Sequence, residues 1–486
     1  TRGQLPEDSQ CDGAWNHPEG YEGDGKRIRS WIELGWDYVE VLKISEDSYM
    51  RNEIFWQQNI ERKVYNRRRI KRRRKKKSRP TGLSFSDNSQ SFFSCQLRLL
   101  KRFGFVLRNL ETSIVNVPKN FSLKNDYDGC LAFFRTLLSS YVFHNGNLII
   151  SFEKCQQSTI ACFSLLEVLL SELNLIKEKY NQSRYQTCKK EVKFIQSVKD
   201  SKTNKYLHSF FGIKLPEEQN DGSKYLKMKV QTGKKRKYFE NTKARVSGNV
   251  TKFVNDSAQE VNAQLRLAGI RALGGMLGEV LGNAEDHCAE YSRWYVDGIS
   301  FSEKQHGVDV VDLNIAIINF GQSMYEGFES TKNKNIENYS KCENLYSIHK
   351  LLFSRNDHFE KESLFTMYML NEGISRLKYK DESRGNGTMK FLKSFITLGS
   401  FGNIDHRFKC QLNIISGHTT LTCDNDIGIY EENGKSKISL NKEHNLKLLP
   451  DKEHLSYNSE YFPGTILECH IYLNKNYFYQ ILKEQQ

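Results

Sequence analysis

The segment from Leu273 to Asp286 constrains the fold of this chain more than any other. Its apolar residues recur at helical spacing, at Leu273, Leu277, Val280, Leu281 and Ala284. This spacing predicts a helix with one buried stripe. Glu279, Asn283 and Asp286 stand at i, i+4 and i+7 of the same helix, so they share one face, roughly 130° from the apolar stripe. Taken alone, such a trio is more often a solvated polar face than a binding site.

A later glycine-rich segment favours the binding site. Residues 384–390 read RGNGTMK and are followed by apolar residues, at Phe391, Leu392, Phe395 and Ile396. This pattern predicts a glycine-rich turn at the start of a helix. Free backbone N–H groups and the positive end of the helix dipole suit such a turn to phosphate.

The carboxy-terminal segment FPGTILECHIYL predicts a strand. Its apolar residues alternate strictly, at Leu467, Cys469, Ile471 and Leu473. Strict alternation predicts a half-buried strand, entered here through Gly464 and Thr465.

The ordered motifs EVLGNAEDH, INFGQS, RGNGT and a PGT before a strand resemble the GHKL ATPase superfamily. Its members include histidine kinases, anti-sigma-factor kinases, DNA gyrase B subunits, mismatch-repair MutL proteins and the ninety-kilodalton heat-shock chaperones. The resemblance extends from near Val246 to Leu473. It implies the Bergerat-type ATP-binding fold, with a layer of helices on a mixed sheet and with ATP and Mg²⁺ as ligands, over residues 246–486.

The resemblance assigns roles to the helix residues. Asn283 falls on the asparagine that completes the Mg²⁺ shell around the triphosphate, a role that suits an oxygen donor facing a hard cation. Glu279 falls on the carboxylate that activates water or a hydroxyl nucleophile in the hydrolysing members. Asp286 matches a position close to the nucleotide.

The adenine loop of the family is altered in this chain. Asn319 and Gly321 correspond to the Asp-x-Gly-x-Gly loop, whose carboxylate accepts a hydrogen bond from the adenine amino group. Asn319 replaces the Asp and Ser323 replaces the second Gly. An Asn oxygen can still accept a hydrogen bond, but it carries no charge and its amide also donates. The resemblance therefore leaves adenine selectivity open.

The remaining motif residues belong to a predicted nucleotide lid and a strand. Gly385, Gly387 and Thr388 match the phosphate loop at the end of the lid, and Thr465 matches the threonine on the adenine side, although an ordinary strand threonine explains it equally. The lid, about residues 322–384, exceeds the length of a bare loop. It includes an expected helix that packs Leu364, Met367, Tyr368 and Ile374. A long helical lid suggests that nucleotide occupancy changes the shape of the protein.

Residues 100–215 predict a small α/β domain. The pattern indicates a helix over 128–142, a strand over 147–153 and a helix over 159–173. The stretch NLIISFEKCQQSTIACFSLLEVLLSEL resembles the centre of a STAS domain, the α/β module of anti-sigma-factor antagonists. Ser158 and Thr159 stand where such domains begin a helix with Ser or Thr. A helix N-cap is the simpler interpretation of these two residues.

One tract carries most of the net charge of +14, because Arg67–Arg79, within a linker at 66–80, holds eleven Lys or Arg and no acid. A block of like charge this dense repels itself, so it is expected to be extended, as a spacer or as an arm against nucleic-acid phosphates. It follows a Trp-rich module at 1–65 of no legible function, with an expected strand near 38–44 and helix near 51–64. A second linker at 216–245 contains KKRK.

Hydropathy excludes a membrane-spanning protein, since the mean hydropathy is −0.63 and no apolar run approaches the ~20 residues that cross a bilayer. The chain opens without a signal-peptide pattern. Its 11 cysteines lack paired CxxC spacing, which predicts reduced thiols and a cytoplasmic location. Cys11 with His17, and His287 with Cys288, lack the second pair that a zinc site needs.

The sequence predicts a multidomain α/β (α+β) protein that binds ATP and Mg²⁺. Its expected role is to couple nucleotide binding or hydrolysis to regulation or conformational switching, with a protein partner or as a homodimer. One alternative is a serine/threonine protein kinase of the anti-sigma-factor type that acts on a STAS-like domain. The other is a nucleic-acid-binding protein with a vestigial ATP site and the Arg67–Arg79 arm. The chain shows no dimerisation helix with a phosphoacceptor His, which argues against two-component signalling.

Overall fold

The computed structural model describes a set of ranges that all belong to one compact unit, Asn88–Gln486. These ranges are 114–143, 147–184, 191–216, 224–233, 242–287, 293–354, 358–374, 389–393, 395, 407–424, 427 and 429–475. The expected module over residues 1–65 and the basic tract Arg67–Arg79 lie outside them.

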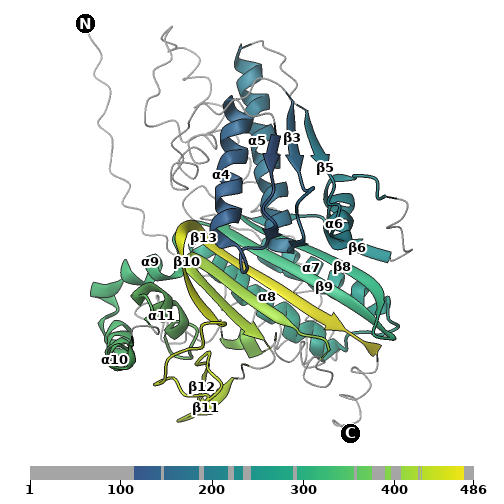
Figure 1. The fold of residues 1–486 in the computed structure, drawn as a ribbon. Coiled ribbons are helices and arrows are strands. Elements are labelled where there is room, and N and C mark those ends of the chain that lie inside the picture. The colour runs from purple at the N-terminus through teal and green to yellow at the C-terminus, as the bar shows by residue number, and fades with distance from the viewer. Residues whose placement is uncertain are drawn as a thin grey trace, which may run out of the picture. The chain divides into compact units, whose positions relative to one another are not determined.

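An α/β segment begins the described part of the chain (Figure 1). A parallel three-stranded sheet has the order β1-β3-β5, with β1 at Ile114–Asn116, β3 at Leu148–Ser151 and β5 at Val192–Ile195. The helices that follow these strands are α4 (Tyr127–Phe143), α5 (Ile160–Arg184) and α6 (Ser201–Phe211). Between them β2 (Asn120–Phe121) pairs in parallel with β4 (Gln157–Ser158). The two helices and the strand predicted here are confirmed, and α5 continues well past its predicted end.

A six-stranded sheet forms the second part of the fold. Its order is β10-β13-β9-β8-β6, and β7 also pairs with β8. The strands are β6 (Lys224–Lys227), β7 (Gln231–Gly233), β8 (Trp294–Gln305), β9 (Val308–Phe320), β10 (Gln411–Asp424) and β13 (Leu455–Leu473). All these pairings are antiparallel, where the resemblance implied a mixed sheet. One cause is the two-residue turn between β8 and β9, in which His306 and Gly307 have φ of 50° and 80°, as tight hairpins require.

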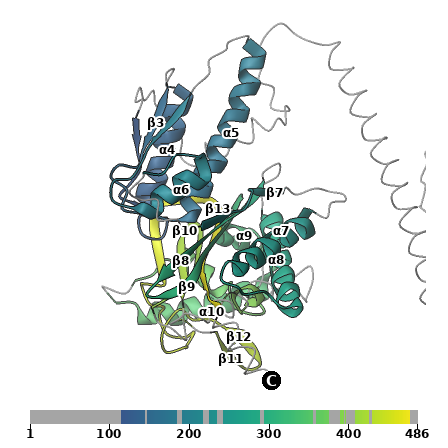
Figure 2. The ribbon, with the colours of Figure 1, turned by 90° about the vertical axis from the view of Figure 1, so that its right-hand side faces the viewer.

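Helices α7 (Thr242–Gln259) and α8 (Leu267–His287) cover one face of this sheet, and α4, α5 and α6 lie on its other side (Figure 2). The predicted stripe of α8 is confirmed, because all five of its apolar residues are buried. Alternate residues of β9 enter two different cores. Ile315 and Ile317 belong to the core with α7 and α8, whereas Ala316 and Ile318 belong to the core with α4 and α5.

This two-sided burial corrects the prediction for β13. The strand is buried on both faces, since Ile466 and Glu468, which alternate with Cys469 and Ile471, are also buried. It begins at Leu455, so Gly464 lies inside the strand and not at its entrance. The alternation in the sequence predicted burial only for the face towards α8. On the other face Glu468 is buried, but a Glu in a sequence pattern is normally interpreted as exposed to solvent.

Three carboxylates are buried on the sheet face that meets the α/β segment. Asp297, Asp312 and Glu468 are only 1%, 2% and 3% exposed. Asp312 pairs with Lys202 Nζ of α6 at 2.6 Å and with His470 Nε2 at 2.7 Å. Although burial raises the pKa of Asp312, these two neighbours lower it well below its usual range. A buried carboxylate needs such partners, so each one fixes where the α/β segment docks.

Glu468 caps helix α5 from the sheet. Its Oε1 accepts a hydrogen bond of 2.9 Å from the backbone N–H of Ala161, in the first turn of α5. The predicted side-chain cap by Ser158 or Thr159 is therefore wrong. Ser158 Oγ instead lies 2.7 Å from Thr203 Oγ1, and the buried Thr159 Oγ1 has no partner among the described residues. A carboxylate at a helix N-terminus also interacts favourably with the dipole.

The chain between β9 and β10 forms helices that pack beside β10 (Figure 1). They are α9 (Met324–Glu329), the 3₁₀ helix η2 (Lys332–Lys334), α10 (Ile336–Leu352) and α11 (Lys361–Tyr368). The expected lid helix is confirmed, because Leu364, Met367 and Tyr368 are buried and Ile374 packs against the same core. The described part of the predicted lid is thus well packed. Two short strands, β11 (Tyr430–Glu432) and β12 (Lys435–Lys437), form a hairpin further along.

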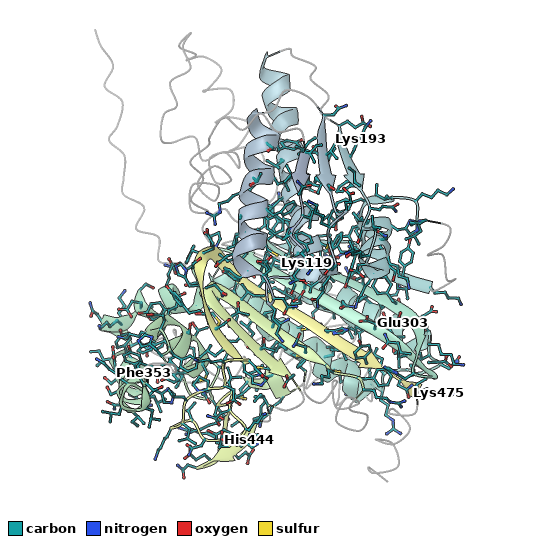
Figure 3. All side chains as sticks on the ribbon, in the orientation of Figure 1. Lys119, Lys193, Glu303, Phe353, His444 and Lys475 are labelled. Atoms are coloured by element: carbon teal, nitrogen blue, oxygen red, sulfur yellow. The ribbon has the colours of Figure 1, made fainter. Side chains whose placement is uncertain are left out.

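The ends of the long strands lie together at one end of the sheet. Figure 3 places Glu303 of β8 near Lys475, which follows β13. In the described part of the chain, no helix has both the length and the apolar character that crossing a bilayer requires.

Glu167 of α5, a neighbour of the buried Asp297, generates a prediction about pH. Burial raises the pKa of Glu167 to about 7, although Lys227 opposes the rise and Asp297 adds to it. Folding therefore disfavours the charged Glu167. Its contribution to stability is present below its unfolded pKa near ~4 and is lost as the pH rises through about 7. We expect Glu167→Gln to reduce this fall in unfolding free energy, measured by urea denaturation across the interval.

The exposed Glu191, which lies 3.6 Å from Lys193, provides the matched control. Glu191→Gln should leave the pH dependence unchanged. A Glu167→Gln variant with the same pH dependence as the unmodified chain would contradict the prediction.

Candidate functional site

Helix α8 carries the polar trio predicted from the sequence. The Glu279 side chain is exposed and that of Asn283 is half-buried. Asp286 lies within α8, less than one turn after Asn283, and its side chain is outside the described part. Glu279 and Asn283 thus lie off the buried stripe, where their side chains can meet a ligand.

Asn319, at the end of β9, joins three elements. Its side chain is only 3% exposed. Nδ2 donates a 3.1 Å hydrogen bond to the carbonyl oxygen of Ala284 on α8, and Oδ1 accepts a 2.8 Å hydrogen bond from the backbone N–H of Thr465 on β13. Because Ala284 follows Asn283, this amide brings the predicted Mg²⁺ ligand, adenine loop and late threonine together.

The strand register explains this meeting. Asn319 pairs with Thr465 on one side and with Trp294 on the other, and Thr465 pairs with Ser416 of β10. Directly paired residues point to the same face of a sheet, so all four side chains face α8. Thr465 Oγ1 lies 2.9 Å from Ser416 Oγ, which makes a short polar row across an otherwise apolar face.

Gly321 and Gly464 allow a close approach of β9 and β13. The backbone N–H of Gly321 donates to the carbonyl oxygen of Pro463 at 3.1 Å. Gly464 has φ of 141°, and a Cβ there would lie 2.0 Å from the carbonyl oxygen of Asn319. Only glycine fits at this position, so the glycine of the PGT motif is required by the backbone.

Ser323 has a structural role that the sequence analysis missed. It is the N-cap of α9, with a full capping box: its Oγ accepts from the backbone N–H of Glu326, and the Glu326 carboxylate accepts from the backbone N–H of Ser323. The spacing S-x-x-E before a helix was the signal that could have found it.

Several predicted site residues lie outside the described ranges. Gly385, Gly387 and Thr388 belong to this group, as does the basic arm Arg67–Arg79. The helix expected after the glycine-rich turn is confirmed where it is described, because residues 389–393 and 395 are helical. Its buried residues are Met389, Phe391, Leu392 and Phe395.

ATP with Mg²⁺ would need hydrogen-bond acceptors for its amino group and oxygen donors for its metal ion. Each oxygen of an amide has two acceptor positions, and the structure gives Asn319 Oδ1 one donor, the Thr465 N–H. The second acceptor position has no donor among the described residues. In the described part of the chain, no group of three or more His, Cys, Asp or Glu could hold a metal ion. Mg²⁺ held by one protein oxygen together with phosphates needs no such group.

No protein-family model, curated protein or solved structure matches this chain. The assignment of the site depends on its geometry and on the motif resemblance.

The position of the Asn319 amide generates a prediction about stability. In Asn319→Asp, a carboxylate oxygen would face the carbonyl oxygen of Ala284 in place of the donating N–H. Two buried acceptors then lack a donor, so we expect the unfolding free energy at pH 7 to fall by ~1–3 kcal/mol. The measurement is urea denaturation, with Asn249→Asp on the exposed side of α7 as the control. A loss no larger than that of the control would show that the amide is not a structural link.

Proposed function

We propose that residues 246–486 bind ATP with Mg²⁺ and couple nucleotide binding or hydrolysis to a change of shape. The observation that carries this proposal is the Asn319 side chain, which bonds to Ala284 O and Thr465 N. Three of the motifs that carry the GHKL resemblance thereby meet at one place although they lie far apart in the sequence, which supports the proposal.

The proposed roles follow from the chemistry of each side chain. Asn283 offers its amide oxygen to Mg²⁺ bound by the triphosphate, and bound Mg²⁺ would neutralise phosphate charge. Glu279 is exposed on the same helix face, so its carboxylate can accept a proton from a water molecule near the terminal phosphate. Asn319 and Thr465 hold the adenine side, and Gly385, Gly387 and Thr388 hold the phosphates.

Contacts that begin at Thr465 support the coupling. Ser416 Oγ lies 2.9 Å from Thr465 Oγ1 and accepts a 2.8 Å hydrogen bond from the backbone N–H of Met324, the first residue of α9. The next residue, Gly417, accepts a hydrogen bond from Tyr127 OH of α4. A shift of Thr465 would thus reach both the helices beside β10 and the α/β segment.

Helix α11 contacts the same segment of β10, next to Gly417. Glu362 Oε1 accepts a 2.9 Å hydrogen bond from the backbone N–H of His418, and burial raises the pKa of this Glu362 carboxyl. This segment of β10 is irregular, because the pairing register of the strand shifts on each side of Gly417. Gly417 itself has φ of 62°. An irregular strand segment that contacts α4, α9 and α11 is suited to transmit a small movement.

Ser158 favours switching over the kinase alternative. Its residue is 7% exposed, and its hydroxyl lies 2.7 Å from Thr203 Oγ1. A phosphoacceptor must reach a nucleotide, so phosphorylation here would require local opening. The nucleic-acid alternative depends on Arg67–Arg79 and stays a prediction from the sequence.

Nucleotide binding is tested by Asn283→Ala. Removal of the amide oxygen should weaken Mg²⁺-dependent ATP binding at least tenfold, because the metal loses its protein ligand, while the half-buried position allows the fold to persist. Binding to the full chain would be measured by titration calorimetry with and without Mg²⁺, and folding by circular dichroism. Asn249→Ala on α7, whose amide contacts only Gln231 among the described residues, is the control. Equal affinity in Asn283→Ala and the control would refute the site.

Hydrolysis is tested separately by Glu279→Gln. The variant keeps the shape and hydrogen-bonding capacity of the side chain but removes the base, which typically contributes ~10² to 10⁴ in rate. We expect ATP binding to persist and phosphate release to fall by that factor, with exposed Glu260→Gln as the control. Equal turnover would show that Glu279 is not the base. Binding without turnover in the unmodified chain would identify a ligand-gated switch.

A further inference from the structure

A groove of about 770 Å³ lies between α7 and α8 and has no role in the proposed function. Gly274 and Gly278 of α8 line one wall, and Ser247, Thr251 and Lys252 of α7 line the other. At ~100° per residue, Gly274 lies roughly 180° around α8 from Asn283. The groove and the nucleotide site therefore lie on different faces of the helix, and the inference does not rest on the proposed function.

Thr251 leaves a hydroxyl without a partner at the base of this groove. The residue is 7% exposed, and its Oγ1 is buried with no hydrogen-bond partner among the described residues. A methyl group at Gly274 would lie 3.9 Å from this oxygen, so the hydroxyl faces the opposite wall. An unpaired buried hydroxyl is costly in free energy. Threonine in a helix has two χ1 rotamers, so this hydroxyl can turn to a bound acceptor.

Glycine keeps the groove open. No atom lies within 4 Å of the position that a Cβ would take at Gly248 or Gly278. Glycine in a helix interior is less favourable than alanine by ~1 kcal/mol, and alanine would be accommodated at both positions. Glycine at these two positions therefore makes the helices less stable than alanine would, and it leaves the groove open.

Lysines give the groove a positive charge at both ends. Lys243 and Lys252 are nine residues apart on α7, which places them ~13 Å apart along the helix. Lys243 pairs with Glu285 Oε2 at 3.3 Å. Lys252 is exposed and pairs with no carboxylate of the described ranges, which makes it the cation available to a ligand.

We propose that the α7–α8 groove binds a small organic anion. The phosphate or carboxylate of the ligand pairs with Lys252, an acceptor atom receives the Thr251 hydroxyl proton, and the body of the ligand lies against Gly274 and Gly278. The volume is in the range of small-molecule sites, ~300–1,000 Å³.

Affinity labelling of the full chain with pyridoxal 5′-phosphate tests this site. The lysine amine adds to the aldehyde, water leaves to form an imine, and borohydride then delivers hydride to the imine carbon, which fixes the label for peptide mapping. We expect Lys252 to be labelled at least tenfold faster than exposed Lys442, because the groove holds the ring of the reagent beside this amine. Equal labelling rates at the two lysines would overturn the proposal.

Filling the groove is the matched test. Gly278→Leu should reduce the labelling of Lys252 to the level of Lys442. Gly275→Leu, on an exposed glycine of the same helix with no atom within 4 Å of its Cβ position, should leave it unchanged. Protection of Lys252 by AMP indicates a phosphate ligand and protection by citrate a carboxylate ligand. Labelling that persists in Gly278→Leu, or protection by neither anion, would overturn the site.

Thr251→Val provides a second, independent readout. Removal of an unpaired buried hydroxyl should raise the Tm of the free protein by roughly 2–4 °C, while it weakens the protection of Lys252 by the effective anion. A lowered Tm, or full protection in the variant, would show that this hydroxyl does not serve a ligand.

Discussion

The side-chain amide of Asn319 is the interaction on which the arrangement of the site depends. It spans from α8 to β13 at the end of β9, and both its polar groups are bonded inside the protein. A buried amide that loses one partner leaves groups unsatisfied at a cost of ~1–3 kcal/mol, so the alignment of the three elements is strongly specified. A carboxylate at this position could not donate to Ala284. The amide of Asn319 thus links helix and sheet through both of its polar groups.

Buried carboxylates set the register of the other sheet face in the same directional way. Apolar contact is non-directional, and it would allow the α/β segment to slide over strands rich in Ile and Val. Asp312 with Lys202, and Glu468 with the first turn of α5, each allow one position only. Residues of 114–213 and of the long strands consequently share one core. The two segments that the sequence analysis treated as separate domains are described here within one compact unit.

The sequence predicted the features that depend on local periodicity. Apolar residues recur every three or four positions in the α8 stripe, in helices α4 and α5 and in α11, and such a period is visible without knowledge of the neighbouring elements.

Features that depend on partners distant in the sequence were missed. The cap of α5 comes from Glu468, 307 residues away from Ala161, so the nearby Ser158 and Thr159 were the only candidates that the sequence offered. The extent of β13 was missed for the same reason, because a buried acid is recognised only when its partner is known. Within the site, the contacts of Asn319 with Ala284 and Thr465 join residues distant in sequence, and the need for glycine at position 464 comes from a backbone contact with Asn319.

The three faces of α8 differ in how closely they pack against the rest of the protein. Its apolar stripe interlocks with the sheet, and Asn319 fixes the carbonyl of Ala284 near its end. Towards α7, the helices share apolar core residues, but Gly274 and Gly278 provide no side chains to interlock along the groove. Ser247 Oγ donates to the carbonyl oxygen of Gly274 there at 2.7 Å. Dispersion contacts are lost where a wall has no partner atoms, so a molecule that fills the groove supplies the packing that this face lacks.

The polar face with Asn283 and Glu279 belongs to the same helix. Ligands on two faces of one helix influence each other only through differences in affinity between its positions, and that influence is reciprocal. If both ligands bind as proposed, nucleotide at one face and an anion at the other would change each other's affinity by the same factor.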